Sequence, residues 1–297
     1  MCGIAGIFLK NPALEPRLGA MLSEMLEVLS DRGPDSAGFA IYGCGHEGGV
    51  KVTLRGASAA ELETGLKVLG ARFANFTAVR RDTHAVVTIA TGEEKTLREF
   101  VATDLPKLQV VGSGQRMEIY KEVGLPASVA TRFKLAGMSG THAIGHTRMA
   151  TESAVTTNGA HPFSTGADQC LVHNGSLSNH NAVRRELKRE GISFETDNDS
   201  EVAAGYLTLQ MREGASLKQA LESSLKDLDG FYTFVVGTEQ GFAVLRDPIA
   251  CKPAVMAETD DYVAFGSEYR ALAVLPGIDK ARVFEPEPAT VYAWERH

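Results

Sequence analysis

A cysteine stands directly behind the initiator methionine, and a β-strand is expected at 4–9. If Met1 is removed, Cys2 carries a thiol and a free α-amino group on the same residue. That pairing would put a nucleophile and a base on one residue. In the alternative interpretation, Cys2 is only a small apolar residue at the edge of a strand.

An N-terminal cysteine of this kind needs no separate histidine. A thiol with a pKa of ~8.5 is only a few per cent thiolate at neutral pH, whereas an α-amino group with a pKa of ~7.7–8.0 is partly unprotonated and can accept the proton. Cys2 would therefore be a self-contained nucleophile. Gly3 and Gly6 would leave space for substrate and backbone beside it, or would only make the strand end flexible.

Composition narrows the class of protein. Of the 297 residues, 44% are hydrophobic and 23% are charged, as in a globular protein of one large or two small domains. The formal net charge of −7 argues against a nucleic-acid partner, because phosphate contacts need clustered Lys and Arg. No apolar run approaches the ~20 residues of a membrane span and no signal peptide is visible, so we expect no membrane contact.

The cysteines favour a cytoplasmic protein with no metal site. They lie far apart and form no CxxC pair, which is typical of free thiols in a reducing compartment. The cysteines are Cys2, Cys44, Cys170 and Cys251.

Hydrophobic periodicity predicts an α+β protein with antiparallel sheets, because strands lie at both ends of the sequence and helices lie between them. Residues 47–132 have their own alternation of strands and helices and none of the polar motifs on either side. We therefore interpret 47–132 as a compact inserted subdomain. The other expected elements are helices at 16–29, 178–190, 199–212 and 216–228, a strand at 38–42 and a hairpin at 231–248.

The segment VHNGS contains a pair of residues with two interpretations. Asn-Gly between apolar residues is a strong signal for a hairpin turn. Alternatively, the side-chain amide of Asn174 and the backbone N–H of Gly175 could form an oxyanion hole for a tetrahedral intermediate. The polar segments nearby favour the second interpretation.

Arg148 and Asp199 are candidates for holding the two charged ends of an amino acid. An arginine can bind a carboxylate with two parallel hydrogen bonds, although a single arginine in a strand is commonly a structural ion pair. Asp199 stands at an expected helix N-cap, where it could cap the helix or bind an ammonium group. Together they would place the side-chain carbonyl of the amino acid at the Cys2 thiol.

These segments resemble one family. MCGIAGIF, DRGPDSAG, GHTRMAT, NGAHPFS, VHNGSLSN and DNDSEV, in this order, resemble the class II glutamine amidotransferase domain over about 1–46 and 136–270. The resemblance implies the four-layer αββα fold of N-terminal-nucleophile hydrolases for a domain covering 2–297. It also implies glutaminase chemistry on L-glutamine.

The resemblance also implies roles for individual residues. Cys2 corresponds to the nucleophile, and Asn174 with Gly175 to the oxyanion hole. Glu152 departs from the family, because some relatives have His there, which affects local substrate contacts and not the chemistry. The substrate-binding positions are Arg148 and Thr151 for the α-carboxylate, Asp199 for the α-amino group, Arg32 around the nucleophile, and His146 of the HTR motif.

The chain is most similar to stand-alone amidotransferase subunits of the glutamate-synthase type. These include the small subunit of N-methylglutamate synthase and GlxB-type proteins. No acceptor domain is visible before His297, so we expect a partner synthase subunit to receive the ammonia. We expect FMN and an iron–sulfur cluster in that partner and no cofactor in this chain.

Three alternatives remain open at this point. The protein could hydrolyse another amide with the same nucleophile. It could be a regulatory or scaffold subunit that binds glutamine and releases little ammonia. The insertion could form part of the docking surface for the partner or be an addition specific to its family.

Overall fold

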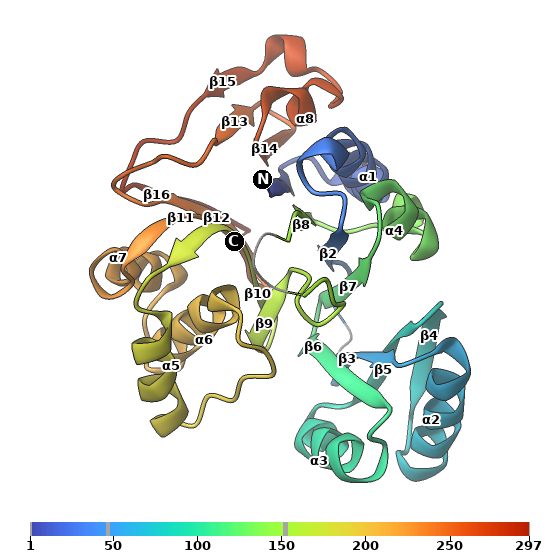
Figure 1. Ribbon diagram of the computed structural model, residues 1–297. Helices are drawn as coiled ribbons and strands as arrows, with labels where there is room; N and C mark the ends of the chain where they lie inside the picture. The colour runs from blue at the N-terminus through green and yellow to red at the C-terminus, as the bar shows by residue number, and fades with distance from the viewer. Residues whose placement is uncertain (1, 46–47, 151–153, 297) are drawn as a thin grey trace.

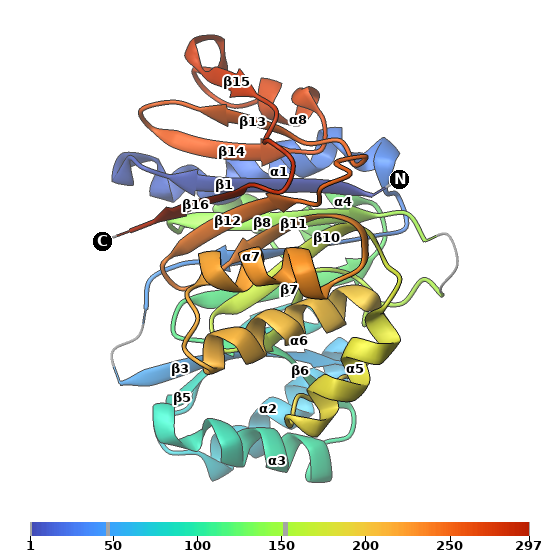
Figure 2. The same cartoon turned by 90° about the vertical axis from the view of Figure 1, so that its left-hand side faces the viewer.

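The computed structural model describes residues 2–45, 48–150 and 154–296. Two antiparallel β-sheets pack face to face, and helices cover the outer face of each sheet (Figures 1 and 2). The expected α+β class and the four-layer αββα architecture are therefore confirmed.

The first sheet places the N-terminal strand at its centre. The strand order is β15-β13-β14-β1-β8-β2-β7, and every neighbouring pair is antiparallel. Because β1 has a partner on each side, the start of the chain is held by two ladders of backbone hydrogen bonds. The strands are β1 (Gly3–Leu9), β2 (Ser36–Tyr42), β7 (Met117–Val123), β8 (His142–Arg148), β13 (Val255–Glu258), β14 (Tyr262–Gly266) and β15 (Arg282–Phe284).

The second sheet contains the expected hairpin, with strand order β16-β12-β11-β10-β9. Its strands are β9 (Phe163–Gly166), β10 (Gln169–Leu177), β11 (Gly230–Gly237), β12 (Gly241–Arg246) and β16 (Val291–Glu295). The helices of the two outer layers are α1 (Leu18–Val28), α4 (Pro126–Arg132) and α8 (Tyr269–Ala273) on the first sheet, and α5 (His180–Arg189), α6 (Asp199–Arg212) and α7 (Leu217–Asp227) on the second.

Alternate residues of β1 fill two different cores. Ile7 and Leu9 pack in the core beneath α1, whereas Ile4 and Phe8 pack between the two sheets. Successive side chains of a strand point to opposite faces, so a strand between two buried layers is apolar throughout. This explains why β1 has no polar side chain to mark one face.

The inserted region forms a separate sheet and core. The strand order is β4-β5-β3-β6. Apolar residues of this sheet and of α2 and α3 form one hydrophobic core. This unit covers 49–114, which is shorter than the predicted 47–132, because β7 pairs with β2 and α4 packs under the first sheet. Its elements are β3 (Gly49–Gly56), α2 (Ala59–Arg72), β4 (Thr77–Arg81), β5 (His84–Ala90), α3 (Glu94–Asp104) and β6 (Leu108–Gly114).

In the described ranges, no helix has both the length and the apolar character that a membrane crossing requires.

One buried histidine joins the two sheets in its neutral form. His142 in β8 donates from Nε2 to the carbonyl oxygen of Thr238 at 2.8 Å, and its ring stacks on Tyr42 with centroids 4.1 Å apart. Burial lowers the pKa of His142 from 6.5 to about 3, although the hydrogen bond to Thr238 raises it. The imidazole therefore stays uncharged in the folded protein at neutral and mildly acidic pH.

This pKa predicts a loss of stability in acid. Between pH 6.5 and pH 3 the unfolded chain binds a proton at His142 and the folded chain does not, so the free energy of unfolding decreases as the pH falls through this window. One histidine contributes about 1.4 kcal/mol per pH unit. Urea unfolding from pH 7 to pH 4 should show a shallower pH slope for His142→Gln than for the wild type, and equal slopes would contradict the prediction.

Candidate active site

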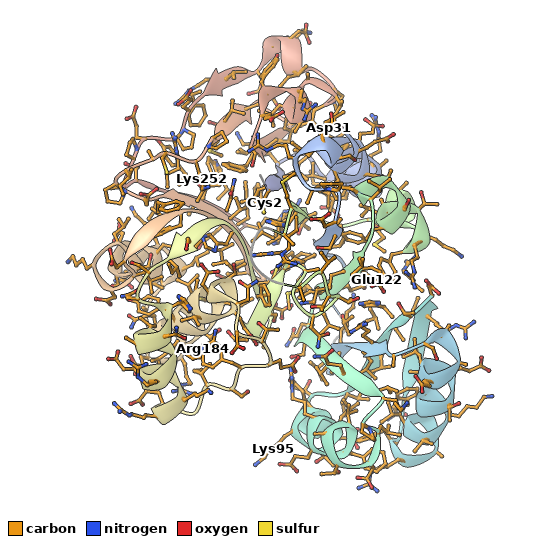
Figure 3. All side chains as sticks on the ribbon, in the orientation of Figure 1. Cys2, Asp31, Lys95, Glu122, Arg184 and Lys252 are labelled. Atoms are coloured by element: carbon orange, nitrogen blue, oxygen red, sulfur yellow. The ribbon has the colours of Figure 1, made fainter. Side chains whose placement is uncertain are left out.

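Cys2 lies where the two sheets meet, immediately before β1. Its carbonyl oxygen accepts hydrogen bonds from Arg32 Nε at 3.0 Å and from Asn174 Nδ2 at 3.3 Å. Its Sγ lies 3.9 Å from the carbonyl oxygen of Met149, which follows β8. The residue is partly exposed, and Figure 3 labels it near the middle of the molecule. Met1 lies outside the described residues.

Arg32 connects Cys2 to a carboxylate. It ends a short 3-10 turn (Ser30–Arg32) after α1, and its guanidinium forms an ion pair with Glu268, which follows β14. Burial raises the pKa of Glu268, but the hydrogen bond and charge of Arg32 and the charge of Arg270 outweigh this and lower it. Glu268 is therefore held as an anion that balances the cation beside Cys2.

The loop after Arg32 packs against the end of β8. A Cβ on Gly33 would lie 2.3 Å from the carbonyl carbon of Thr147 and 2.4 Å from the backbone nitrogen of Arg148, so only glycine fits there. Asp35 accepts from the backbone N–H of Ala150 at 2.8 Å. These contacts bring Arg32 close to Arg148, at the end of strand β8.

Arg148 ends β8 next to the start of β1, where Gly3 pairs with Thr147. Its side chain is buried, and Nη1 donates to the carbonyl oxygen of Ala154 at 3.4 Å. The predicted positions Thr151 and Glu152 lie outside the described residues.

Asn174 and Gly175 lie inside strand β10 and not in a turn. Their partners in β11 are Thr233 and Tyr232, and the pairing continues on both sides. Gly175 has φ +154°, and a Cβ there would lie 2.0 Å from the carbonyl oxygen of Phe231 and 2.8 Å from Nε2 of His173. The hairpin interpretation of Asn-Gly is therefore wrong, and glycine is required by close approach within the sheet.

Asp199 is the first residue of α6 and does not cap it. The N-cap is Asn198, whose side chain accepts from the backbone N–H of Ser200. One oxygen of Asp199 accepts from the backbone N–H of Leu177 at 2.9 Å, which ties α6 to the end of β10. The N-cap is therefore Asn198 and not Asp199, the residue that the sequence predicted. The carboxylate of Asp199 remains partly exposed.

A network of buried polar side chains lies behind these residues. His146 in β8 has no exposed surface and donates from Nε2 to the carbonyl oxygen of His173 at 3.1 Å, and its ring stacks on His161 at 4.0 Å. The Ser200 hydroxyl lies 2.8 Å from Nε2 of His161 and 2.8 Å from Nδ1 of His173. Burial lowers the pKa of His146 to about 3, so this ring is neutral at pH 7.

The structure thus brings together Cys2, Arg32, Arg148 and Asn174, whereas His146 supports them from inside the sheets. Sequence reasoning missed His173, His161 and Ser200, although all three stand inside the motifs VHNGSLSN, NGAHPFS and DNDSEV. Their polar side chains at predicted buried positions are the signal that could have identified them. Glu268 has no such signal, because it follows an ordinary strand.

A cleft of about 430 Å³ lies elsewhere, between the insertion, β9 and α6. Arg55, Lys121 and Asn158 are among its lining residues, and Cys2 is not. Arg32 and Asn174 converge on Cys2, so we take its surroundings as the candidate active site. In 2–45, 48–150 and 154–296, no cluster of three or more His, Cys, Asp or Glu could hold a metal ion.

Comparisons with known proteins identify the family of this chain. A model of the glutamine amidotransferase domain matches residues 146–274. The glutamine amidotransferase-like protein GlxB of Rhizobium meliloti (strain 1021) is 62% identical over 301 residues, covering 99% of this chain and 98% of that protein.

Two solved structures share the fold. The allosteric regulatory enzyme of purine biosynthesis has a TM-score of 0.65 at 21% identity, covering 99% of this chain and 47% of that one. The glutamine phosphoribosylpyrophosphate amidotransferase from B. subtilis has a TM-score of 0.61 at 20% identity, covering 99% and 49%. The chain thus spans about half the length of these two proteins. Together with the relative at 62% identity, the fold shows that this chain belongs to the class II glutamine amidotransferases, which are N-terminal-nucleophile hydrolases.

Proposed function

We propose that this protein hydrolyses L-glutamine to glutamate and ammonia through a thioester on Cys2. The observation that carries the proposal is the convergence of Arg32 and Asn174 on the carbonyl of Cys2, which fixes the nucleophile between the two sheets. After removal of Met1, the α-amino group of Cys2 accepts the thiol proton and the sulfur attacks the side-chain amide carbon of glutamine. The C–N bond then breaks, the amine returns the proton to the leaving nitrogen, and ammonia departs. Water hydrolyses the thioester and regenerates the thiol.

The oxyanion of the tetrahedral intermediates is stabilised by Asn174 and Gly175. Nδ2 of Asn174 carries two N–H groups, and one of them donates to Cys2 at 3.3 Å. The second N–H of Asn174 and the backbone N–H of Gly175 supply the donors for the developing charge. The ladder between β10 and β11 holds both residues rigidly, so little reorganisation is needed during the reaction.

Arg148 and Asp199 bind the two charged ends of glutamine, with Thr151 beside the α-carboxylate. Arg148 stands at the end of β8 beside Cys2, and Asp199 stands at the start of α6 behind β10. Arg32 shapes the site through Cys2 and Glu268. We assign His146 a supporting role in place of the predicted substrate contact, because its ring is fully buried.

The ammonia passes to a partner synthase subunit of glutamate-synthase or N-methylglutamate-synthase type, in a cytoplasmic complex. The family supports this proposal, because an amidotransferase transfers the amide nitrogen to an acceptor. FMN and an iron–sulfur cluster belong to that partner, and this chain holds no cofactor of its own. The alternative is a glutamine-binding regulatory subunit with weak turnover.

Replacing the nucleophile tests the reaction itself. Cys2→Ala should abolish glutamate release and leave the fold intact, because the side chain is partly exposed and at the start of a strand. Intact mass should show that Met1 is absent, and an electrophilic glutamine analogue should add mass at Cys2 only. Cys44→Ala is the matched control, since Cys44 is an exposed free thiol. Full activity in Cys2→Ala would refute the mechanism.

Kinetics should separate binding residues from the oxyanion hole. Arg148→Ala and Asp199→Asn should mainly raise KM, by a loss of about 2–5 kcal/mol if the site is desolvated. Asn174→Ala should lower kcat by roughly a hundredfold or more, because it acts on charge that develops in the transition state. A raised KM with unchanged kcat in Asn174→Ala would remove Asn174 from the oxyanion hole.

Purifying this chain alone and together with the proteins that bind it tests whether it has a partner synthase. The isolated chain should release glutamate slowly, and its kcat should rise when the partner is present, because free ammonia would otherwise be lost. Equal turnover in both states with no protein recovered would favour a free-standing glutaminase. A recovered partner that binds ATP and no flavin would contradict the glutamate-synthase type and leave the glutaminase chemistry in place.

A further inference from the structure

A stretch of nine residues joins Arg148 to the insertion. We call residues 154–162 the bridging segment. At its start the carbonyl oxygen of Ala154 accepts from Arg148 Nη1 at 3.4 Å. A Cβ on Gly159 would lie 3.6 Å from the same nitrogen, so the segment passes the guanidinium twice. The position of the bridging segment therefore affects the position of Arg148.

The insertion contacts the bridging segment directly. Arg55, in β3 of the inserted sheet, donates from Nη1 to the side-chain oxygen of Asn158 at 2.8 Å. Asn158 is the neighbour of Gly159. A single hydrogen bond thus connects the separate sheet of the insertion to the backbone that passes Arg148.

A second connection runs through two buried residues. Thr157 donates to Glu122 in β7, and both side chains are buried. The other oxygen of Glu122 lies 3.6 Å from Arg132 Nη1, and Arg132 forms an ion pair with Asp82 in the turn between β4 and β5 of the insertion. Figure 3 places Glu122 on the side of the molecule where the insertion lies.

Lys121 fixes the rest of the bridging segment. Its buried Nζ donates to the carbonyl oxygens of Asn158, Ala160 and Pro162 at 3.2, 2.9 and 3.4 Å, and it lies 4.6 Å from the centre of the Phe163 ring. Three backbone carbonyls on one ammonium hold this half of the segment against β7. The part nearest Arg148 is held in addition by the side chains of Thr157 and Asn158, whose partners connect to the insertion.

We propose that the insertion positions Arg148 for the α-carboxylate of glutamine, with Arg55 and Glu122 acting as positioning residues through the bridging segment. The inference rests on the proposed role of Arg148 and gives the insertion a role in substrate recognition. Loss of Arg55 removes the hydrogen bond to the Asn158 side chain and leaves Lys121 on its backbone carbonyl, so the bridging segment is held less firmly and the guanidinium of Arg148 shifts from its binding geometry. The effect falls on glutamine binding, because the nucleophile and the oxyanion hole are held by other contacts.

The test is steady-state kinetics on Arg55→Ala and Asn158→Ala. Each should raise KM for glutamine about threefold to tenfold with kcat nearly unchanged, as expected for loss of one hydrogen bond that aids binding. The double variant should be no worse than either single variant, because both remove the same contact. Arg80→Ala is the matched control, since Arg80 pairs with exposed Glu63 within the insertion, and it should leave KM unchanged.

A modified substrate separates this role from a general structural one. Glutamine with its α-carboxylate replaced by a carboxamide no longer engages the charge of Arg148, so Arg55→Ala should impair its turnover much less than that of glutamine. Equal impairment of both substrates, or an unchanged KM in Arg55→Ala beside a raised KM in Arg148→Ala, would overturn the inference. An unchanged KM in Arg148→Ala would instead refute the proposed role of Arg148. Thermal unfolding of each variant shows whether the fold is retained.

Discussion

The carbonyl group of Cys2 is the contact on which the arrangement of the site depends. It accepts one hydrogen bond from Arg32, which follows α1, and one from Asn174 in the opposite sheet. The first residues of a chain usually fray unless they are tied down. Here a chain end is held by two donors from separate layers, and β1 continues it between β14 and β8. The site can therefore form only when both sheets are packed.

The buried side chains behind Asn174 include histidines in their neutral form. The carbonyl oxygen of His173 can only accept, so His146 carries its proton on Nε2. The Ser200 hydroxyl has a single proton and three partners: the rings of His161 and His173 at 2.8 Å, and Oδ1 of Asp199, to which it donates at 3.3 Å. Ser200 lies in the first turn of α6, so these contacts hold the turn in which Asp199 stands.

The sequence predicted local features better than long-range contacts. Strand β1 and helix α6 follow from periodicity, whereas the four layers and the roles in the site came from the family resemblance. Strand β4 was missed because its residues are mostly exposed and do not alternate, and α4 because it has only seven residues. The pair Asn-Gly at 174–175 has the sequence pattern of a turn but lies within a strand. Glycine is needed there because the carbonyl of Phe231 approaches from the neighbouring strand, which a local sequence pattern cannot show. The pair of Arg32 and Glu268 joins residues 236 positions apart, and no local pattern predicts it.

The charged groups around Cys2 form a series of ion pairs that begins at Arg32. Arg32 pairs with Glu268 and donates to the Cys2 carbonyl, and its Nη2 is buried with no hydrogen-bond partner in the part of the chain that the structure describes. Glu268 also pairs with Arg270, so its negative charge is shared between two arginines. Arg270 in turn pairs with Asp31, so the two arginines of this cluster are balanced by two carboxylates. The Nη2 group of Arg32 is therefore the donor that the cluster can still offer near Cys2.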